Sequence, residues 1–241
     1  MNNPQSNPFY SEAPKPVTKK KVLSNIITVV AVIAIVLLVS WFTILGQNLV
    51  DGPSMRSNFY TGDFLMINRF PAILGEGVSK NLGIDYERGD IIVLQEPGLP
   101  EFVKRVMAKE GEKINIDKGR VFINGKVMVE DYLPEKLYTN GGSFLPEGAA
   151  PYEVPPGYLI AIGDNRPESN DSRFKEIGAI KREWVKGKVF LRIWPANAFA
   201  FMPRGTFHFE DPSTYDFSKI DMDFRNPTSR TGICINLAQC F

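Results

Sequence analysis

Residues 120–129 read RVFINGKVMV, with a short apolar run on each side of an Asn-Gly pair. Asn124 and Gly125 both tolerate the positive φ angles that a two-residue hairpin turn requires. Apolar runs on both sides of such a turn are typical of two paired strands. The sequence therefore predicts a β-hairpin with strands at 120–123 and 126–129.

Outward from this hairpin, the chain after residue 50 keeps the same pattern of short apolar runs separated by Gly, Pro, Asn and Asp. The candidate strands are 63–70, 90–95, 102–108, 113–116, 120–123, 126–129, 158–162 and 188–194. No long stretch of this region has the sustained 3.6-residue period of an amphipathic helix. The sequence predicts a mainly β fold, with its sheets folded into a barrel or a sandwich.

One segment near the N-terminus departs from this pattern. Residues 26–45 read IITVVAVIAIVLLVSWFTIL, and residues 22–50 contain no charged side chain. Twenty helical residues span about 30 Å, the thickness of a bilayer core. A buried core helix would show a polar face, and a cleavable signal peptide would be shorter and followed by small residues rather than Trp41 and Phe42. We therefore expect an uncleaved transmembrane signal-anchor over residues 22–46.

The charges that flank this segment predict its orientation. Lys19, Lys20 and Lys21 come directly before it, so we expect the N-terminus to be cytoplasmic and the rest of the chain to lie outside a cell membrane that it crosses once. Residues 1–21 then form a cytoplasmic tail, whose first 18 residues contain four prolines and are expected to be disordered.

The outer part of the chain divides into two regions. We expect residues 47–204 to form the β-rich domain, with an inserted hairpin and loop region at about 112–156, and residues 205–241 to form a C-terminal extension. Cys234 and Cys240 lie in that extension, in a compartment that permits disulfides. Their spacing allows a bond that closes a small loop, and free thiols or links to a partner are the alternatives.

The composition excludes several kinds of function. The 241 residues include 28 Lys and Arg against 27 Asp and Glu, for a net charge of +1, and a nucleic-acid binder is usually more basic. One His and two Cys nearly exclude a His/Cys zinc site and a dense disulfide scaffold. We expect no cofactor and no metal.

A lysine within an apolar strand is the first candidate for chemistry. Lys104 shares a strand face with Phe102 and Val106, and burial would lower its pKa far enough for it to act as a base toward a serine. The alternative is a charge that protects an edge strand from aggregation. Ser54 follows Gly52 and Pro53 in a predicted turn just after the apolar segment, where it is a candidate nucleophile or an ordinary turn residue. The single histidine, His208, has the context of a surface or tail residue.

A series of short sequence blocks in a fixed order favours the catalytic roles of Ser54 and Lys104 over the ordinary ones. The blocks are SM at 54–55, GDF at 62–64, RGDIIV at 88–93, FVKRV at 102–106 and GDNRPESNDSR at 163–173. Each block alone is a weak signal, but their order after a membrane anchor resembles the bacterial type I signal peptidase family. The resemblance covers roughly residues 22–195. It implies a β-rich serine endopeptidase that cleaves signal peptides from exported preproteins.

The resemblance also implies roles for individual residues. Ser54 matches the nucleophile, Lys104 the general base, and Ser169 the hydroxyl that orients the lysine. The residues that match the structural part of the last block are Gly163, Asp164, Asp171 and Arg173, whose acidic and basic side chains we expect to pair. The family uses the backbone N–H of its nucleophile, here Ser54, in the oxyanion hole. Many members add a hydroxyl two residues earlier, where this chain has Gly52.

The family binds its substrate in extended form, with small side chains at positions −1 and −3 before the cut, typically Ala-X-Ala. Side chains two apart lie on the same face of an extended peptide, so two shallow apolar pockets are needed. The matching pocket positions are Val50, Met55, Phe59, Leu65, Val93, Phe102 and Val103. Ordinary core packing is the alternative for these residues. The implied partners are signal peptides, the lipid bilayer and the protein export machinery, and no nucleic acid.

This chain departs from the family pattern near the nucleophile. Ser57-Asn58-Phe59 stands where the family usually has Pro-Thr-Leu, and Pro53 directly precedes Ser54. These departures leave open a catalytically impaired, membrane-anchored binding module of the same fold. A sortase-like transpeptidase is a further alternative, because such enzymes are also anchored and β-rich. It would require a catalytic Cys with His and Arg.

Overall fold

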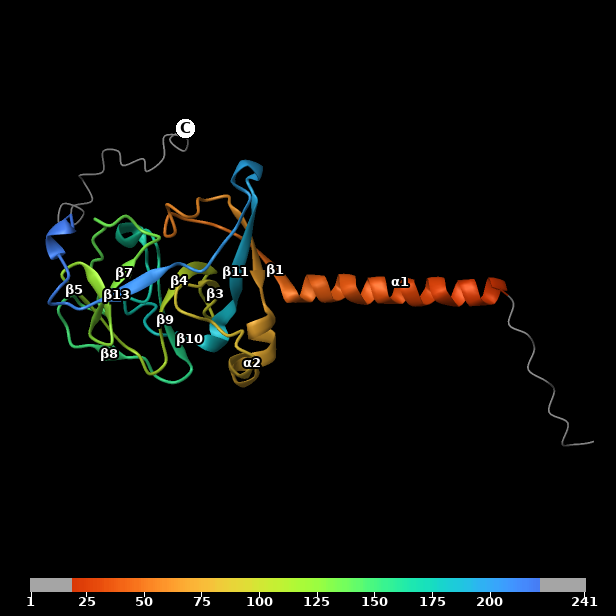
Figure 1. Ribbon diagram of the computed structural model, residues 1–241, viewed down its shortest axis with the longest axis horizontal. Coiled ribbons are helices and arrows are strands. Elements are labelled where there is room, and N and C mark those ends of the chain that lie inside the picture. Colours follow the sequence, from red (N-terminus) through yellow and green to blue (C-terminus); the bar gives the residue numbers. More distant parts are fainter. Residues whose placement is uncertain (1–18, 222–241) are drawn as a thin grey trace, which may run out of the picture. The chain divides into compact units, whose positions relative to one another are not determined.

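The computed structural model describes residues 19–221 (Figure 1). It divides into two units, Met1–Thr43 and Ile44–Phe241. The tail expected at residues 1–18 and the cysteines Cys234 and Cys240 lie outside the described residues, so their predicted states stay predictions.

The first unit contains helix α1 (Lys19–Ile44). Its segment Lys20–Val39 has a mean hydropathy of 3.0 and none of it is buried. Between Ile26 and Val39 the sequence has one polar residue, Thr28, so this part of the helix has no polar face. By length and composition this helix can cross a membrane. It ends at Ile44, two residues before the predicted end of the anchor.

The second unit is mainly β, which confirms the predicted class, and every strand pair between its named strands is antiparallel (Figure 1). The larger sheet has the order β1-β2-β11-β3-β4-β9-β10, with β12 paired to β11. Its strands are β1 (Leu45–Leu49), β2 (Phe64–Asn68), β3 (Ile91–Leu94), β4 (Phe102–Lys109), β9 (Tyr158–Ile162), β10 (Ile180–Lys181), β11 (Val185–Trp194) and β12 (Ala200–Phe201).

The smaller sheet has the order β13-β7-β6-β5-β8. Its strands are β5 (Lys113–Asp117), β6 (Arg120–Ile123), β7 (Lys126–Glu130), β8 (Tyr152–Glu153) and β13 (Phe207–Glu210). The predicted hairpin is present between β6 and β7, and Asn124 and Gly125 have φ angles of 52° and 80°. Strand β13 lies beyond residue 205, so the start of the expected extension pairs with β7 and belongs to this sheet.

Helical segments are short in the second unit. They are α2 (Phe70–Asn81) and the 3-10 helices η2 (Arg166–Glu168), η3 (Arg182–Trp184), η4 (Ala196–Ala198) and η5 (Phe217–Lys219). The predicted strand 63–70 is therefore too long, because Asn68 Oδ1 accepts a hydrogen bond from the Phe70 N–H and Pro71 begins the helix. Helix α2 is kinked at Gly75, where φ is 74°, which explains why no sustained helical period is visible in the sequence.

Three apolar clusters form the core. The first packs the smaller sheet against β4 and β9 through residues such as Met107, Ile116 and Ile162. The second lies under β1, β2 and β3 and consists of Val50, Met55, Phe59, Leu65, Ile67, Ile91, Val93, Val103 and Val189. The third contains Tyr86, Ile92 and Ile180. The second cluster, named cluster 2 below, supports the turn that carries Ser54.

Candidate active site

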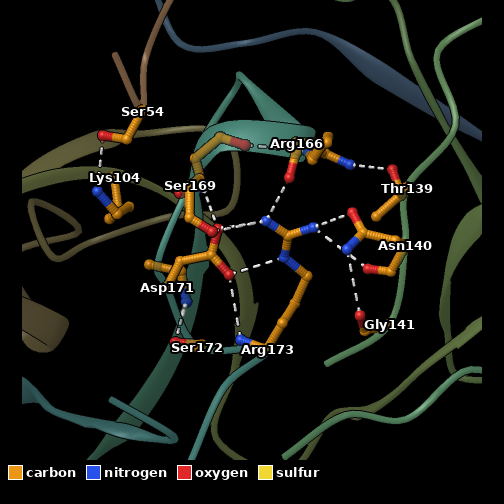
Figure 2. Close-up of polar contacts among 12 residues, drawn as sticks. Ser54, Lys104, Thr139, Asn140, Gly141, Arg166, Ser169, Asp171, Ser172 and Arg173 are labelled. Carbon is orange, nitrogen blue, oxygen red and sulfur yellow. Dashed lines mark hydrogen bonds and ion pairs between the residues drawn. The ribbon is translucent and has the colours of Figure 1, made fainter. Parts of the chain in front are cut away.

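Ser54 and Lys104 meet although 50 residues separate them in the chain. Ser54 lies in the tight turn after β1, where the Arg56 N–H donates to Pro53 and the Phe59 N–H donates to Met55. Lys104 lies in β4, and its Nζ atom is 2.8 Å from Ser54 Oγ (Figure 2). The side chains are therefore within hydrogen-bond distance of each other.

The surroundings of Lys104 make its neutral form more accessible than that of an exposed lysine. Its side chain is 2% exposed, and burial is the largest cause that lowers its pKa, to about 8. The charges of Asp171 and Asp164 oppose this shift, and that of Arg173 adds to it. Lys104 pairs with Ile92 of β3, and the pairing of β4 with β9 starts only at Arg105, so one side of the strand is open at Lys104. Because its side chain is nevertheless buried, the interpretation of Lys104 as a solvent-exposed charge that protects a strand edge does not fit.

The turn after β9 holds the backbone of the Ser54 turn. The Asn165 N–H donates to the Ser54 carbonyl over 3.0 Å, and the Asn165 side chain donates to the Pro53 carbonyl over 2.9 Å. Gly163 packs just behind these bonds. A Cβ atom at this position would lie 2.5 Å from the Ser54 carbonyl and 2.2 Å from Ser169 Oγ, so only glycine fits.

A buried ion pair joins this turn to β4. Arg105 binds Asp164 with two hydrogen bonds, of 2.8 Å from Nε and 2.7 Å from Nη2. Asn58, in the Ser54 turn, also donates to Asp164 over 2.7 Å. The expected pairing of Asp164 within its own block is therefore wrong, and neither Arg105 nor Asn58 was among the predicted site residues. The one sequence feature that could have indicated their role is that Asn58 and Arg105 are polar residues directly before the apolar residues Phe59 and Val106.

A second buried ion pair, between Asp171 and Arg173, lies in the same block as expected (Figure 2). Arg173 donates to Asp171 over 2.8 Å from Nε and 2.9 Å from Nη2. Burial alone would raise the pKa of Asp171, but the Arg173 guanidinium holds it below its ordinary value. Asp171 also accepts from the Gly163 N–H over 3.0 Å, so this pair fixes the residue behind Ser54.

Ser169 lies close to this pair, and its hydroxyl is near enough to Asp171 to help lower the pKa of that carboxyl. Its Oγ atom is buried and makes no hydrogen bond of ordinary geometry within residues 19–221. The backbone carbonyl of Ser169 accepts from Arg173 Nη2 over 3.1 Å, which holds the residue in place. The expected bond from Ser169 to Lys104 is not formed in this conformation, and the orienting role stays a prediction.

One donor is available for an oxyanion. The Ser54 N–H has no hydrogen-bond acceptor within the described part of the chain. Gly52 has a φ angle of 93°, which favours glycine, and its own N–H donates to Thr61 Oγ1 over 3.1 Å. Gly52 therefore shapes the turn but offers no side-chain donor.

The predicted pocket residues fall mostly in one place. Six of the seven belong to cluster 2: Val50, Met55, Phe59, Leu65, Val93 and Val103. Each is at most 7% exposed, so in this conformation they are core residues, and their role in substrate pockets stays a prediction. Phe102 packs instead against the third cluster, and its ring centroid is 5.4 Å from Lys104 Nζ.

The remaining chemical candidates lie elsewhere. His208 is on β13, with an exposed side chain that contacts Asp131 and Glu210, in keeping with the expected surface position. Within residues 19–221, no group of three or more His, Cys, Asp or Glu side chains could hold a metal ion. The site therefore consists of a serine, a buried lysine and the polar residues that hold them.

Comparison with known proteins finds one matching family and several similar proteins. The family described as "Signal peptidase, peptidase S26" matches residues 23–194. Signal peptidase I of Bacillus caldolyticus is 34% identical over 158 residues, which cover 63% of this chain and 81% of that protein. Signal peptidase IB of Staphylococcus aureus strain COL is 30% identical over 200 residues, covering 78% and 98%. A solved signal peptidase I structure from Enterococcus faecalis V583 aligns with a TM-score of 0.34 and 24% identity, covering 43% of this chain and 96% of that one.

Proposed function

Because this chain belongs to the signal peptidase family, peptidase S26, and is therefore a serine peptidase, we propose that it is a membrane-anchored endopeptidase that removes signal peptides from exported preproteins. In this proposal Ser54 is the nucleophile and Lys104 is the general base. The observation that carries it is the 2.8 Å separation of Lys104 Nζ and Ser54 Oγ, at a lysine that is 2% exposed.

The first half of the reaction forms an acyl-enzyme. Neutral Lys104 accepts the hydroxyl proton of Ser54 while Oγ attacks the scissile carbonyl carbon, which gives a tetrahedral oxyanion. The Lys104 ammonium then gives its proton to the nitrogen of the departing chain as the C–N bond breaks. The mature protein leaves with a free amino terminus, and the signal peptide stays esterified to Ser54.

The second half consumes one water molecule. Lys104 accepts a proton from water as the water oxygen attacks the ester carbonyl, and it returns that proton to Ser54 Oγ as the C–O bond breaks. In both halves the Ser54 N–H is free to donate to the oxyanion. The hydrogen bond from Asn165 to the Ser54 carbonyl supports this role, because it fixes the backbone around that N–H.

The protonation of Lys104 suits this chemistry. A pKa of about 8 leaves about a tenth of the lysine neutral at pH 7. An exposed lysine, with a pKa of about 10.4, would be neutral in less than about one molecule in a thousand. Burial therefore increases the supply of base more than a hundredfold, at the cost of desolvating an amine in the folded protein.

Two strand edges favour an extended substrate. Strand β1 has one neighbour in its sheet, β2, among the described strands. Strand β4 pairs with β3 from residue 102, but its pairing with β9 starts only at Arg105. A peptide can add to such edges through its backbone. Cluster 2 lies beside them, and its bulky members suit pockets that accept only small side chains at positions −1 and −3.

An anchor in the membrane would suit this chemistry, because signal peptides are cut at the membrane surface. In our proposal α1 spans the bilayer with its lysine-rich start in the cytoplasm, and the catalytic unit lies outside. Ser54 comes ten residues after Ile44, the end of the helix, and ten residues of chain can reach at most about 35 Å, which limits how far Ser54 lies from the membrane surface. Signal peptides, bilayer lipids and the export machinery are the partners that follow from this arrangement.

The experiment is a cleavage assay in detergent micelles with a preprotein that has an Ala-X-Ala site. The wild type should release a product whose new N-terminus, read by mass spectrometry, follows the −1 alanine. Ser54→Ala should release none. The matched control is Ser57→Ala, which changes an exposed serine of the same turn and should cleave normally.

Three results would contradict the proposal. Cleavage by Ser54→Ala would assign the nucleophile to another residue. Failure of folded wild-type protein to cleave would favour the binding-module alternative. Loss of activity on thiol alkylation would favour a sortase-like transpeptidase, since that chemistry needs a cysteine.

A further inference from the structure

Asn48, in β1, has a buried amide of which one half is unpaired. Its side chain is 6% exposed, and its Nδ2 atom donates to Glu101 Oε2 over 2.5 Å. Its Oδ1 atom is buried and has no partner in the described part of the chain. A carboxylate only accepts hydrogen bonds, so the amide nitrogen must face Glu101 and the oxygen must face away from it.

The unpaired oxygen belongs to the apolar side of β1. Asn48 pairs with Leu65 across β1 and β2, and cross-strand partners share a sheet face. Val50 lies two residues further along and shares that face as well. Leu65 and Val50 are both members of cluster 2. A polar acceptor therefore sits among the residues that we expect to contact the substrate's small side chains.

Asn48 and Glu101 also connect the two strand edges proposed to hold the substrate. Asn48 is in β1, and Glu101 directly precedes β4. Glu101 is itself held by an ion pair with Lys186. Further along the same two edges, Ser54 meets Lys104. The amide of Asn48 is thus fixed in direction next to the path of an extended peptide that ends at Ser54.

We propose that Asn48 is a specificity-determining residue, whose Oδ1 accepts a hydrogen bond from the hydroxyl of a Ser or Thr at position −3 of the substrate. A strand that adds to β1 satisfies its backbone with the backbone of β1, so the Asn48 side chain faces a substrate side chain. Asn48 is two residues further from Ser54 than Val50. If Val50 contacts position −1, Asn48 contacts position −3.

This inference rests on the proposed function, and it predicts a preference that apolar pockets alone would not give. A site that leaves an acceptor buried and unpaired disfavours a ligand that lacks the matching donor. Thr and Val have the same shape and differ by a hydroxyl in place of a methyl group. An apolar pocket would prefer Val, whereas Asn48 should reverse that order.

The test compares kcat/KM for preproteins that differ only at position −3, where they carry Thr or Val. The wild type should cleave the Thr substrate about tenfold more efficiently. Asn48→Leu keeps a similar shape without the acceptor, and its Thr-to-Val ratio should fall to one or below. The ratio within each variant is the readout, so a general loss of activity does not affect it.

Two further variants complete the test. Gln47→Leu changes the neighbouring exposed residue, whose side chain points to the other face of β1, and should keep the wild-type ratio. In Glu101→Gln the new amide can both donate and accept hydrogen bonds, so it no longer fixes the direction of the Asn48 amide. The Thr-to-Val ratio of kcat/KM should then move toward one. This second variant tests the inference if Asn48→Leu does not fold.

The possible failures can be distinguished. A wild-type ratio of one, or an unchanged ratio in Asn48→Leu, would overturn this inference and leave the proposed peptidase activity in place. A wild type that cleaves no Ala-X-Ala substrate would overturn the proposed function and this inference with it.

Discussion

The backbone N–H of Asn165 donates to the carbonyl of Ser54 over 3.0 Å, so the turn after β9 fixes the turn after β1. The two turns are more than 100 residues apart in the chain. Because Ser54 and Lys104 are in different segments, their 2.8 Å contact depends on such long-range bonds. The catalytic geometry that we propose is therefore a property of the assembled sheet rather than of a local motif.

Removal of the base should abolish cleavage without unfolding the protein. Lys104→Met replaces the amine by an apolar group of similar length, and kcat should fall by about 10²–10⁴-fold, the usual contribution of a general base. Lys104→Arg should be equally inactive, because arginine stays protonated. Circular dichroism checks the fold, and cleavage by either variant at more than about a tenth of the wild-type rate would contradict the role of Lys104.

Activity should increase with pH across the neutral range. Lys104 must be neutral to accept a proton, and burial lowers its pKa to about 8. The value of kcat/KM should therefore rise with pH and level off above about pH 8, on the basis of the lysine alone. The measurement is a pH–rate profile with a single preprotein, and a flat profile between pH 6 and about 9 would contradict a lysine base.

The same pKa predicts that the base costs stability. The lysine is neutral more readily in the folded state than in the unfolded state, where its pKa is about 10.4. Between about pH 8 and about pH 10.4 the unfolded chain binds the extra proton, so stability rises with pH in that window and the penalty is fully present below it. Lys104→Met should remove the penalty and raise the free energy of unfolding at pH 7 by about 3 kcal/mol. Urea denaturation measures this, and a destabilised variant would contradict it.

Gly163→Ala should damage the active site directly. The new methyl group would lie 2.5 Å from the Ser54 carbonyl and 2.2 Å from Ser169 Oγ, so the Ser54 turn must move. We expect kcat to fall at least about tenfold and stability to fall by about 1–3 kcal/mol. Gly77→Ala is the control, because a Cβ atom there meets no atom within 4 Å. Equal effects of the two substitutions on kcat would contradict this account.

The buried pair of Arg105 and Asp164 should matter more for stability than any surface pair. Both side chains are at most 3% exposed, so Asp164→Asn leaves Arg105 as a buried charge without its ion-pair partner. The expected loss is about 3–5 kcal/mol, measured by urea denaturation. Glu153→Gln breaks the exposed pair with Lys113 and should cost less than about 1 kcal/mol. A loss below about 1 kcal/mol in Asp164→Asn would show that the pair is not needed for folding.

Local sequence patterns predicted the local structure well. The Asn124-Gly125 turn specified its hairpin because both residues accept positive φ angles, and strands 120–123 and 158–162 begin and end where expected. Helix α2 was missed because Gly75 and Gly77 remove the helical pattern, and the structure forms it through Pro71 and tertiary packing instead. The strand β13 was missed because only its pairing with β7 defines it.

Of the residues in the candidate site, the sequence predicted some and missed others. Ser54 and Lys104 could be named because ordered sequence blocks carry them, and their contact agrees with that assignment without testing the chemistry. Asn58 and Arg105 could not be assigned, because which carboxylate pairs with which base depends on the packing of β4 against the turn after β9. The unpaired Oδ1 of Asn48 is likewise visible only once its neighbours are placed.

The central claim is that Lys104 is a base poised near neutral pH, and the most direct test is titration of its side chain. NMR of protein with ¹³C-labelled lysine can follow the Cε signal of Lys104, assigned by its absence from the Lys104→Met spectrum. The account predicts a pKa of about 8 for this signal, matching the midpoint of the kcat/KM profile. A pKa of about 10.4, the value of an exposed lysine, would contradict it.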